Sequence, residues 1–268
     1  MNKTAISVAL AVTGCLLLSA GDAQAQRRGA KKVDALAADL RGPDSGKAKA
    51  AAKALAAVKG AAATGALLDG LALGLPSAVS VAALDAVAKR GDAKAYPAVV
   101  HYLRHRRASV RVAAVGAAGA MSDKRAAAKV ILALRDSDKK VRAKAAGIIA
   151  EKKWKGAIEP LIALLKRGDD ASAPALAALA NPELARAIGE LIGSAPDGLL
   201  SRCLGAILVR PDFKPEEARV EVVRVLGRIP GSDSLEQLTN YVGSLPETSR
   251  RRSRREAQAI IEQRLGGD

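Results

Sequence analysis

A two-helix pattern recurs at a constant spacing through the first two thirds of this sequence. Apolar segments typical of a first helix begin, at intervals of 31 residues, at Ala37, Leu68, Val99, Val130 and Leu161. A second series with the same interval begins at Ala48, Val79, Val110, Val141 and Ser172. One such helix pair cannot bury its apolar stripe without a stacked neighbour, so this period indicates an α-solenoid. We therefore predict an all-α fold of stacked antiparallel helix pairs.

The regular spacing ends near residue 180. Further helices are predicted at about residues 182–192, 197–208, 215–229, 234–242 and 248–265. No long polar linker interrupts this part of the chain, so we interpret residues 33–268 as a single solenoid with irregular repeats and a C-terminal cap after residue 180. Residues 26–32 are short, polar and basic, and we expect a disordered leader there.

The second helix carries a recognisable pattern. The run Asp138-Lys139-Lys140-Val141-Arg142 leads into Ala145-Ala146-Gly147, and the apolar run of residues 157–165 follows in the first-helix position of the next unit. This arrangement resembles HEAT repeats, in particular the bacterial HEAT-like class named after phycobilisome lyases. The segment from Arg219 to Gly227 is similar to a further second helix. The resemblance covers most of the chain and implies the fold only, because HEAT families include scaffolds, lyase subunits, regulators and DNA glycosylases.

The first 25 residues have the features of a secretory signal. Lys3 gives a basic start, an apolar run extends from Ala5 to Leu18, and Ala23-Gln24-Ala25 supplies small residues before the cleavage position. We therefore expect an exported protein, periplasmic or secreted. Val12-Thr13-Gly14-Cys15 also resembles a lipoprotein box, and the alternative is a lipid anchor on Cys15. The apolar run is short for a membrane span, and no transmembrane helix is expected.

The chain is strongly basic. It holds 43 Lys and Arg against 27 Asp and Glu, which gives a formal net charge of +16. Such an excess attracts anionic partners without choosing among them. Aromatic residues make up only 2% of the chain, so the stacking platforms that single-stranded nucleic acid uses are nearly absent. Together with the predicted export, this favours an acidic protein or an anionic envelope component over nucleic acid.

Two sets of cations recur with the repeat. One set follows the first helices and the other lies on the second helices, and equivalent positions of stacked repeats line up roughly 10 Å apart. The candidates for an edge that binds anions or a partner are Arg104, Arg106, Arg107, Arg111, Arg135, Arg142, Lys166 and Arg167. For Arg111 and Arg142 we favour a structural interpretation, in which acidic turn residues such as Asp136 and Asp169 pair with them.

No catalytic motif is found. His101 and His105 share a helix face, but arginines surround them and no acidic or cysteine ligand accompanies them, so we predict no metal site. An alternative role for these histidines is to extend the basic surface on protonation. Cys203 lies among leucines at helical spacing and is interpreted as a buried small hydrophobe. With no nucleophile elbow or phosphate-binding loop, we predict neither catalytic residues nor a cofactor.

These observations lead to a functional hypothesis. We expect a non-catalytic scaffold that mediates protein–protein or envelope interactions through a basic solenoid surface, with the third to fifth repeats as the contact region. Two alternatives stay open. One is a lyase-type or small-molecule-binding HEAT subunit, and the other is a polyanion binder whose affinity falls steeply with salt.

Overall fold

The computed structural model describes residue 24 and residues 27–266. These residues form helices and turns without any strand, which confirms the predicted all-α class. The chain divides into two compact units, the first ending at Asp123 and the second beginning at Lys124. We call them unit 1 and unit 2 and describe each by itself. The predicted signal segment, with Cys15, lies outside the described residues except for residue 24.

Unit 1 begins with a helix whose described part covers residues 27–41. Its other helices are α2 (Ser45–Ala57), α3 (Ala61–Ala72), α4 (Ser77–Arg90), η1 (Ala93–Ala95), α5 (Tyr96–Tyr102) and α6 (Ala108–Ala120). Residues 27–32 are thus helical, whereas their short, polar and basic sequence predicts a disordered leader. Their arginine, alanine and lysine residues have high helix propensity, and they continue into a helix that buries Val33, Ala37 and Leu40.

Unit 2 contains the remaining helices. They are α7 (Lys124–Leu132), η2 (Ala133–Arg135), α8 (Lys139–Lys152), η3 (Lys155–Ala157), α9 (Ile158–Lys166), α10 (Ser172–Leu179), α11 (Pro182–Gly189), α12 (Asp197–Leu208), α13 (Glu216–Arg228), α14 (Ser232–Gly243) and α15 (Arg252–Leu265). Among the described residues of the whole chain, no helix has both the length and the hydropathy to cross a membrane.

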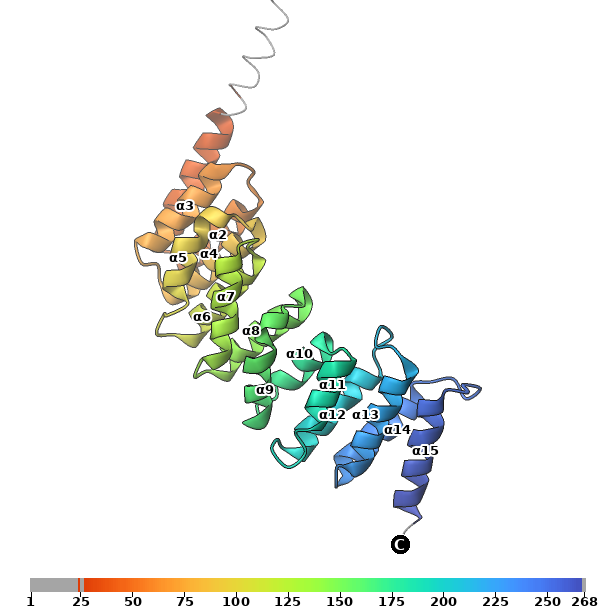
Figure 1. Ribbon diagram of the computed structural model, residues 1–268. Coiled ribbons are helices and arrows are strands. Elements are labelled where there is room, and N and C mark those ends of the chain that lie inside the picture. Colours follow the sequence, from red (N-terminus) through yellow and green to blue (C-terminus); the bar gives the residue numbers. More distant parts are fainter. Residues whose placement is uncertain (1–23, 25–26, 267–268) are drawn as a thin grey trace, which may run out of the picture. The chain divides into compact units, whose positions relative to one another are not determined.

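Within each unit the helices stack in rows, as the repeat predicts (Figure 1). In unit 1, α4 packs between α2 and α6, and in unit 2, α10 packs between α8 and α12, which also contacts α14. We call these helices the B row; they include the predicted second helices. In unit 2, α13 packs between α11 and α15, and we call these three the A row. The predicted helix-pair repeat is therefore confirmed.

One assignment based on the resemblance was wrong. The segment from Arg219 to Gly227 belongs to α13 and hence to the A row, not to the second-helix row. The segment resembles a second helix only in its local sequence. Arg219 donates hydrogen bonds to the backbone carbonyls of Leu208 and Arg210, so it anchors the turn before its own helix. An arginine in the first turn of a helix can do this in either row.

The core of the B row is built largely of small side chains. Ala52, Ala83, Ala114 and Ala145 are fully buried, and they recur every 31 residues on α2, α4, α6 and α8. Alanine lets helices approach toward the close end of the usual range of about 8–10 Å. Each such contact buries little apolar area, at roughly 25 cal/mol per Å². Packing alone therefore stabilises each joint modestly.

Helix ends follow the sequence closely. The side chain of Asp138 accepts a hydrogen bond from the backbone N of Lys140 at 2.8 Å, and Asn181 caps α11 in the same way through the N of Leu184 at 2.9 Å. Such caps satisfy backbone donors that have no partner within the helix. Gly91 ends α4 in the left-handed region with φ 62°, where glycine has no steric penalty.

Lys153 is a non-glycine residue in the same left-handed region, with φ 55°, at the end of α8. Its Nζ donates to the backbone carbonyl of Ala178, near the end of α10, at 2.5 Å. Carbonyls in the last turn of a helix have no partner within it. The lysine thus ends its own helix and supplies a donor to the next B-row helix, which offsets the unfavourable backbone conformation.

Arginines make the same kind of joint between successive B-row helices. Arg90, at the end of α4, donates to the carbonyls of Leu55, Val58 and Gly60 at 3.0, 2.5 and 2.6 Å. Its Nε also donates to Oγ1 of Thr64 at 2.8 Å. One guanidinium therefore satisfies three carbonyls at the end of the preceding helix α2 and fixes the turn after it.

In unit 2, Arg210 repeats this arrangement between B-row helices, and Arg264 repeats it between the A-row helices α15 and α13. Arg210 donates to the carbonyls of Ala177 and Ala180 at 2.5 and 2.8 Å, and Arg264 donates to the carbonyl of Ile229 at 2.9 Å. In each case the acceptor lies 30–35 residues earlier, about one repeat back. We call Arg90, Arg210 and Arg264 the carbonyl clamps. Part of the positive charge of the chain is thus used to hold repeats together.

Replacing Arg90 with alanine is expected to lower the free energy of unfolding of unit 1 by about 2 kcal/mol, because hydrogen bonds from a charged donor to three carbonyls are lost. Hydrogen exchange of α2 to α4 and urea denaturation of the full chain would measure the loss. The control is Lys89→Ala, an exposed neighbour on the same helix, expected to change stability by less than about 0.5 kcal/mol. Equal losses in the two variants would contradict the clamp.

Candidate partner-binding site

The unit 1 candidates surround the turn between α5 and α6. Arg104, Arg106 and Arg107 are exposed. Arg111 is half-buried, and its Nη1 donates to the carbonyls of His105 and Arg106 at 2.9 and 3.3 Å. Arg111 therefore stabilises the turn before its own helix, while the other three arginines face solvent.

Arg142 occupies the equivalent position in unit 2. Its Nη1 donates to the carbonyls of Asp136 and Ser137, both at 2.9 Å, and its Nε forms an ion pair with Asp169 at 2.5 Å. The side chains of Arg142 and Asp169 are only 21% and 11% exposed. The pairing with an acidic turn residue that the sequence favours is thus present for Arg142. Arg142 joins the turn before α8 to the turn before α10.

A polar cavity of about 390 Å³ lies between these two turns. It is lined by Leu134, Arg135, Asp136, Ser137, Arg142, Leu164, Arg167, Gly168 and Asp169. The structure therefore brings three of the predicted residues, Arg135, Arg142 and Arg167, around one space. Lys166 is exposed on the last turn of α9 and does not line the cavity. We call Arg135, Lys166 and Arg167 the turn edge.

The acidic residues of this cavity are already engaged. Asp169 accepts from Arg142 and from the backbone N of Ala171, and Asp136 accepts from the backbone N of Asp138 at 2.9 Å. Among the described residues, no carboxylate forms an ion pair with a member of the turn edge. Arg135 and Arg167 therefore face solvent at a polar cavity, and the exposed Lys166 is the chain neighbour of Arg167.

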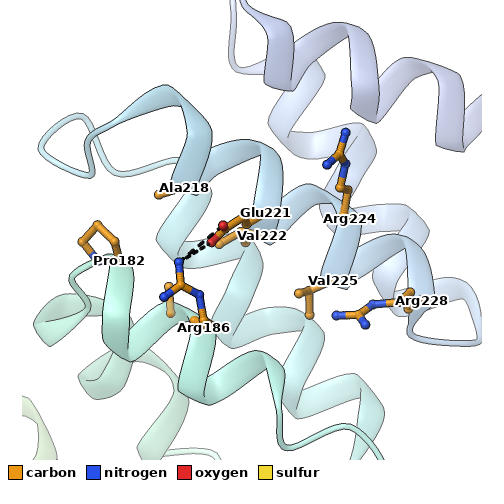
Figure 2. A pocket seen from close by; sticks show the side chains of 9 residues that line it. Pro182, Arg186, Ala218, Glu221, Val222, Arg224, Val225 and Arg228 are labelled. Atoms are coloured by element: carbon orange, nitrogen blue, oxygen red, sulfur yellow. Dashed lines mark hydrogen bonds and ion pairs between the residues drawn. The ribbon is translucent and has the colours of Figure 1, made fainter.

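Sequence reasoning missed a second feature of unit 2, a groove between the A-row helices α11 and α13 (Figure 2). Its first part, of about 390 Å³, is lined by Pro182, Ala185, Arg186, Ala218, Glu221, Val222, Arg224, Val225 and Arg228. A second part, of about 520 Å³, shares Arg186, Val225 and Arg228 with the first and adds Gly189, Glu190 and Ile192. The small residues of α11 at helical spacing were the signal that could have indicated it.

Both histidines lie against the ring of Tyr102. The ring of Tyr102 stacks on His105 with centroids 6.0 Å apart and meets His101 edge-on at 5.6 Å. The Tyr102 hydroxyl donates to the carbonyl of Leu71 at 2.7 Å. Within residue 24 and residues 27–266, no group of three or more His, Cys, Asp or Glu side chains could hold a metal ion.

Comparisons with known proteins give only distant structural likenesses. No protein-family model matches the sequence, and no curated protein matches it. Among solved structures, the complex of CpcE and CpcF of phycocyanin lyase from Nostoc sp. PCC7120 is 20% identical, with a TM-score of 0.43 over 86% of this chain and 94% of that one. A designed armadillo repeat protein in complex with a (KR)4 peptide is 17% identical, with a TM-score of 0.37 over 85% and 97%. Likenesses at this level do not bear on function.

The helix rows themselves define the class. Successive short helices pair through tight turns and stack on the preceding pair within each unit. The protein is therefore an all-helical repeat protein of the HEAT/armadillo-like type.

Replacing Arg142 with alanine is expected to destabilise unit 2 by about 2–3 kcal/mol, because Asp169 and two backbone carbonyls lose a charged donor. The variant Arg135→Ala removes a cation of the turn edge and is expected to leave stability within about 0.5 kcal/mol. Urea denaturation of both variants checks the contrast. A large loss on removing Arg135 would show that the turn edge is structural.

Burial of Cys203 raises the pKa of its thiol to about 12, above its ordinary value of 9.0. The native thiol should therefore resist a disulfide reagent at neutral pH and react only on unfolding. The unfolded thiol ionises near pH 9. The contribution of Cys203 to the free energy of unfolding is therefore full below that pH and is lost as the pH rises toward 12. The stability difference between the wild type and Cys203→Ala should shrink over that range. Rapid labelling at Cys203 itself in the folded wild type, located by peptide mass spectrometry, would contradict the assignment.

Proposed function

We propose that the protein is a non-catalytic scaffold that holds an acidic partner protein against the turn edge of unit 2. The observation that supports this is the contrast between two kinds of cation. Arg90, Arg142 and Arg210 are engaged with carbonyls or carboxylates, whereas Arg135, Lys166 and Arg167 are exposed and lack an acidic partner among the described residues. Cations left unneutralised beside a preformed cavity provide charge complementarity to an acidic surface.

The rigidity of the site supports the same proposal. The cavity lies between two turns that Arg142 links through one ion pair and two carbonyl contacts. Arg167 is also held in part, because its Nε donates to the carbonyl of Ala163 at 3.2 Å. A partly preorganised cation loses less conformational freedom when a carboxylate binds, which favours affinity.

We further infer that this scaffold acts after export, as a periplasmic or secreted protein. Support comes from the sequence alone, through the basic start, apolar run and small residues of its first 25 positions. Mass analysis of the N-terminus of protein from its native host tests this part. A chain beginning after residue 25 supports export in free form, a lipid on Cys15 supports the anchored form, and an intact Met1 overturns both.

Reversing the charge of Arg135, Lys166 and Arg167 together to glutamate is expected to weaken capture of the acidic partner at least about tenfold. Affinity purification from the native host, with quantitative mass spectrometry, would measure the loss. The matched control reverses Lys139, Lys144 and Lys155, three other exposed cations of unit 2, and so changes the net charge equally. Retention of the partner by the turn-edge variant would contradict the proposal.

Salt dependence separates a specific partner from general attraction to polyanions. Retention on an immobilised polyanion depends on total charge and falls steeply with salt, so both triple variants should lose it equally. At about 0.15 M salt, exposed charges are screened beyond about 8 Å. Under these conditions only the turn-edge variant should lose capture of the acidic protein, and the control variant should keep it. Equal losses of the protein in both variants would favour the polyanion alternative.

A further inference from the structure

We propose that the α11–α13 groove of unit 2 is a docking site for an acidic amphipathic helix of a partner protein. This groove is distinct from the turn edge and is formed by different elements. Figure 2 shows its residues converging from the two A-row helices. The proposal does not depend on the turn edge binding anything.

The groove exists because α11 has small residues on the side that faces α13. Pro182, Ala185 and Gly189 follow one another at intervals of three and four residues, so they share one helix face. A β-carbon at Gly189 would lie 3.0 Å from Cγ2 of Val225, which shows how closely the helices approach there. No long apolar side chain of α11 fills the space between them.

The floor and the rim of the groove differ in chemistry. Ala218, Val222 and Val225 of α13 give an apolar floor, and the rim is formed by charged side chains. The lining charges of the two parts are the cations Arg186, Arg224 and Arg228 and the anions Glu190 and Glu221. A helix with one apolar face and a flanking acidic row matches this arrangement.

Arg228 is the anchor for such a helix. Arg186 pairs with Glu221 at 3.1 Å and Arg224 pairs with Glu256 at 2.7 Å, whereas Arg228 is exposed and forms no ion pair among the described residues. The Arg186–Glu221 pair is itself exposed, at 61% and 49%, and such pairs are worth only about 0–1 kcal/mol. A ligand carboxylate can therefore displace Glu221 from Arg186 at little cost.

A helix fits the groove better than an extended peptide. Both walls are α-helices, whose interior backbone groups already bond within their own helix. An extended peptide would find no backbone partner there, while a helix satisfies its own backbone. The stretch from Ala218 to Arg228 covers ten residue steps, which is roughly 15 Å at 1.5 Å per residue. The groove thus accommodates about three turns of a docked helix.

The test uses a fluorescent synthetic helix of about 14 residues, with leucines on one face and glutamates beside them. Binding to the purified full-length protein is followed by anisotropy. Two matched peptides carry lysine in place of glutamate, or serine in place of leucine. We expect saturable binding of the first peptide and at least about tenfold weaker binding of the other two.

Protein variants then locate the peptide. Arg228→Glu is expected to weaken binding at least about tenfold, whereas Arg255→Glu, an exposed arginine of α15 that does not line the groove, should keep the affinity within about twofold. Circular dichroism confirms that both variants fold. Equal losses in the two variants, or equal binding of the serine peptide, would show charge attraction alone and overturn the proposal.

The turn-edge triple variant separates this inference from the proposed function. Reversal of Arg135, Lys166 and Arg167 should leave binding of the acidic helix unchanged. If that variant abolished binding while Arg228→Glu retained it, the helix would occupy the turn edge and the groove proposal would be wrong. If the acidic partner protein were lost only from the Arg228→Glu variant, the groove would stand and the turn edge would fail.

Discussion

The donation of side-chain hydrogen bonds from arginine to backbone carbonyls at the ends of helices is the interaction on which the stacked repeats depend. Alanine at Ala52, Ala83, Ala114 and Ala145 lets the B-row helices approach but contributes little apolar area per contact. The carbonyls that end each helix would meanwhile lack partners. A guanidinium with five donors satisfies several of them at once, as Arg90 does. At the end of α2, which buries Ala52, thin packing and a carbonyl clamp therefore occur together.

This use of arginine changes how the charge of the chain should be understood. A net charge of +16 suggests a large binding surface, yet several arginines point to the protein's own backbone. Others form ion pairs between neighbouring A-row helices, where the hydrogen bond from Arg224 lowers the pKa of Glu256. What is left for a partner is a smaller set. In unit 2 the cations left for a partner include the turn edge, beside a polar cavity, and Arg228, in a groove with an apolar floor.

The fold was largely predictable from the sequence, and the sites only in part. The 31-residue interval fixed the positions of α4, α6 and α8, because apolar spacing and capping residues act locally. Arg135 and Arg167 could be grouped from the same interval, but their relation to Arg142 and Asp169 could not, since it depends on how two turns meet. The groove was not predicted because it arises from the absence of long apolar side chains on the side of α11 that faces α13. In addition, α13 stacks in the A row although its sequence resembles a second helix.

The carbonyl clamps have a consequence for acidic surroundings. A backbone carbonyl does not titrate, and a guanidinium stays protonated at every pH at which proteins work. The joint made by Arg90, Arg210 or Arg264 is therefore indifferent to acid, whereas the pair between Arg224 and Glu256 disappears once the carboxylate takes up a proton. The hydrogen bonds of these three clamps therefore persist on acidification, whereas the ion pair between α13 and α15 does not.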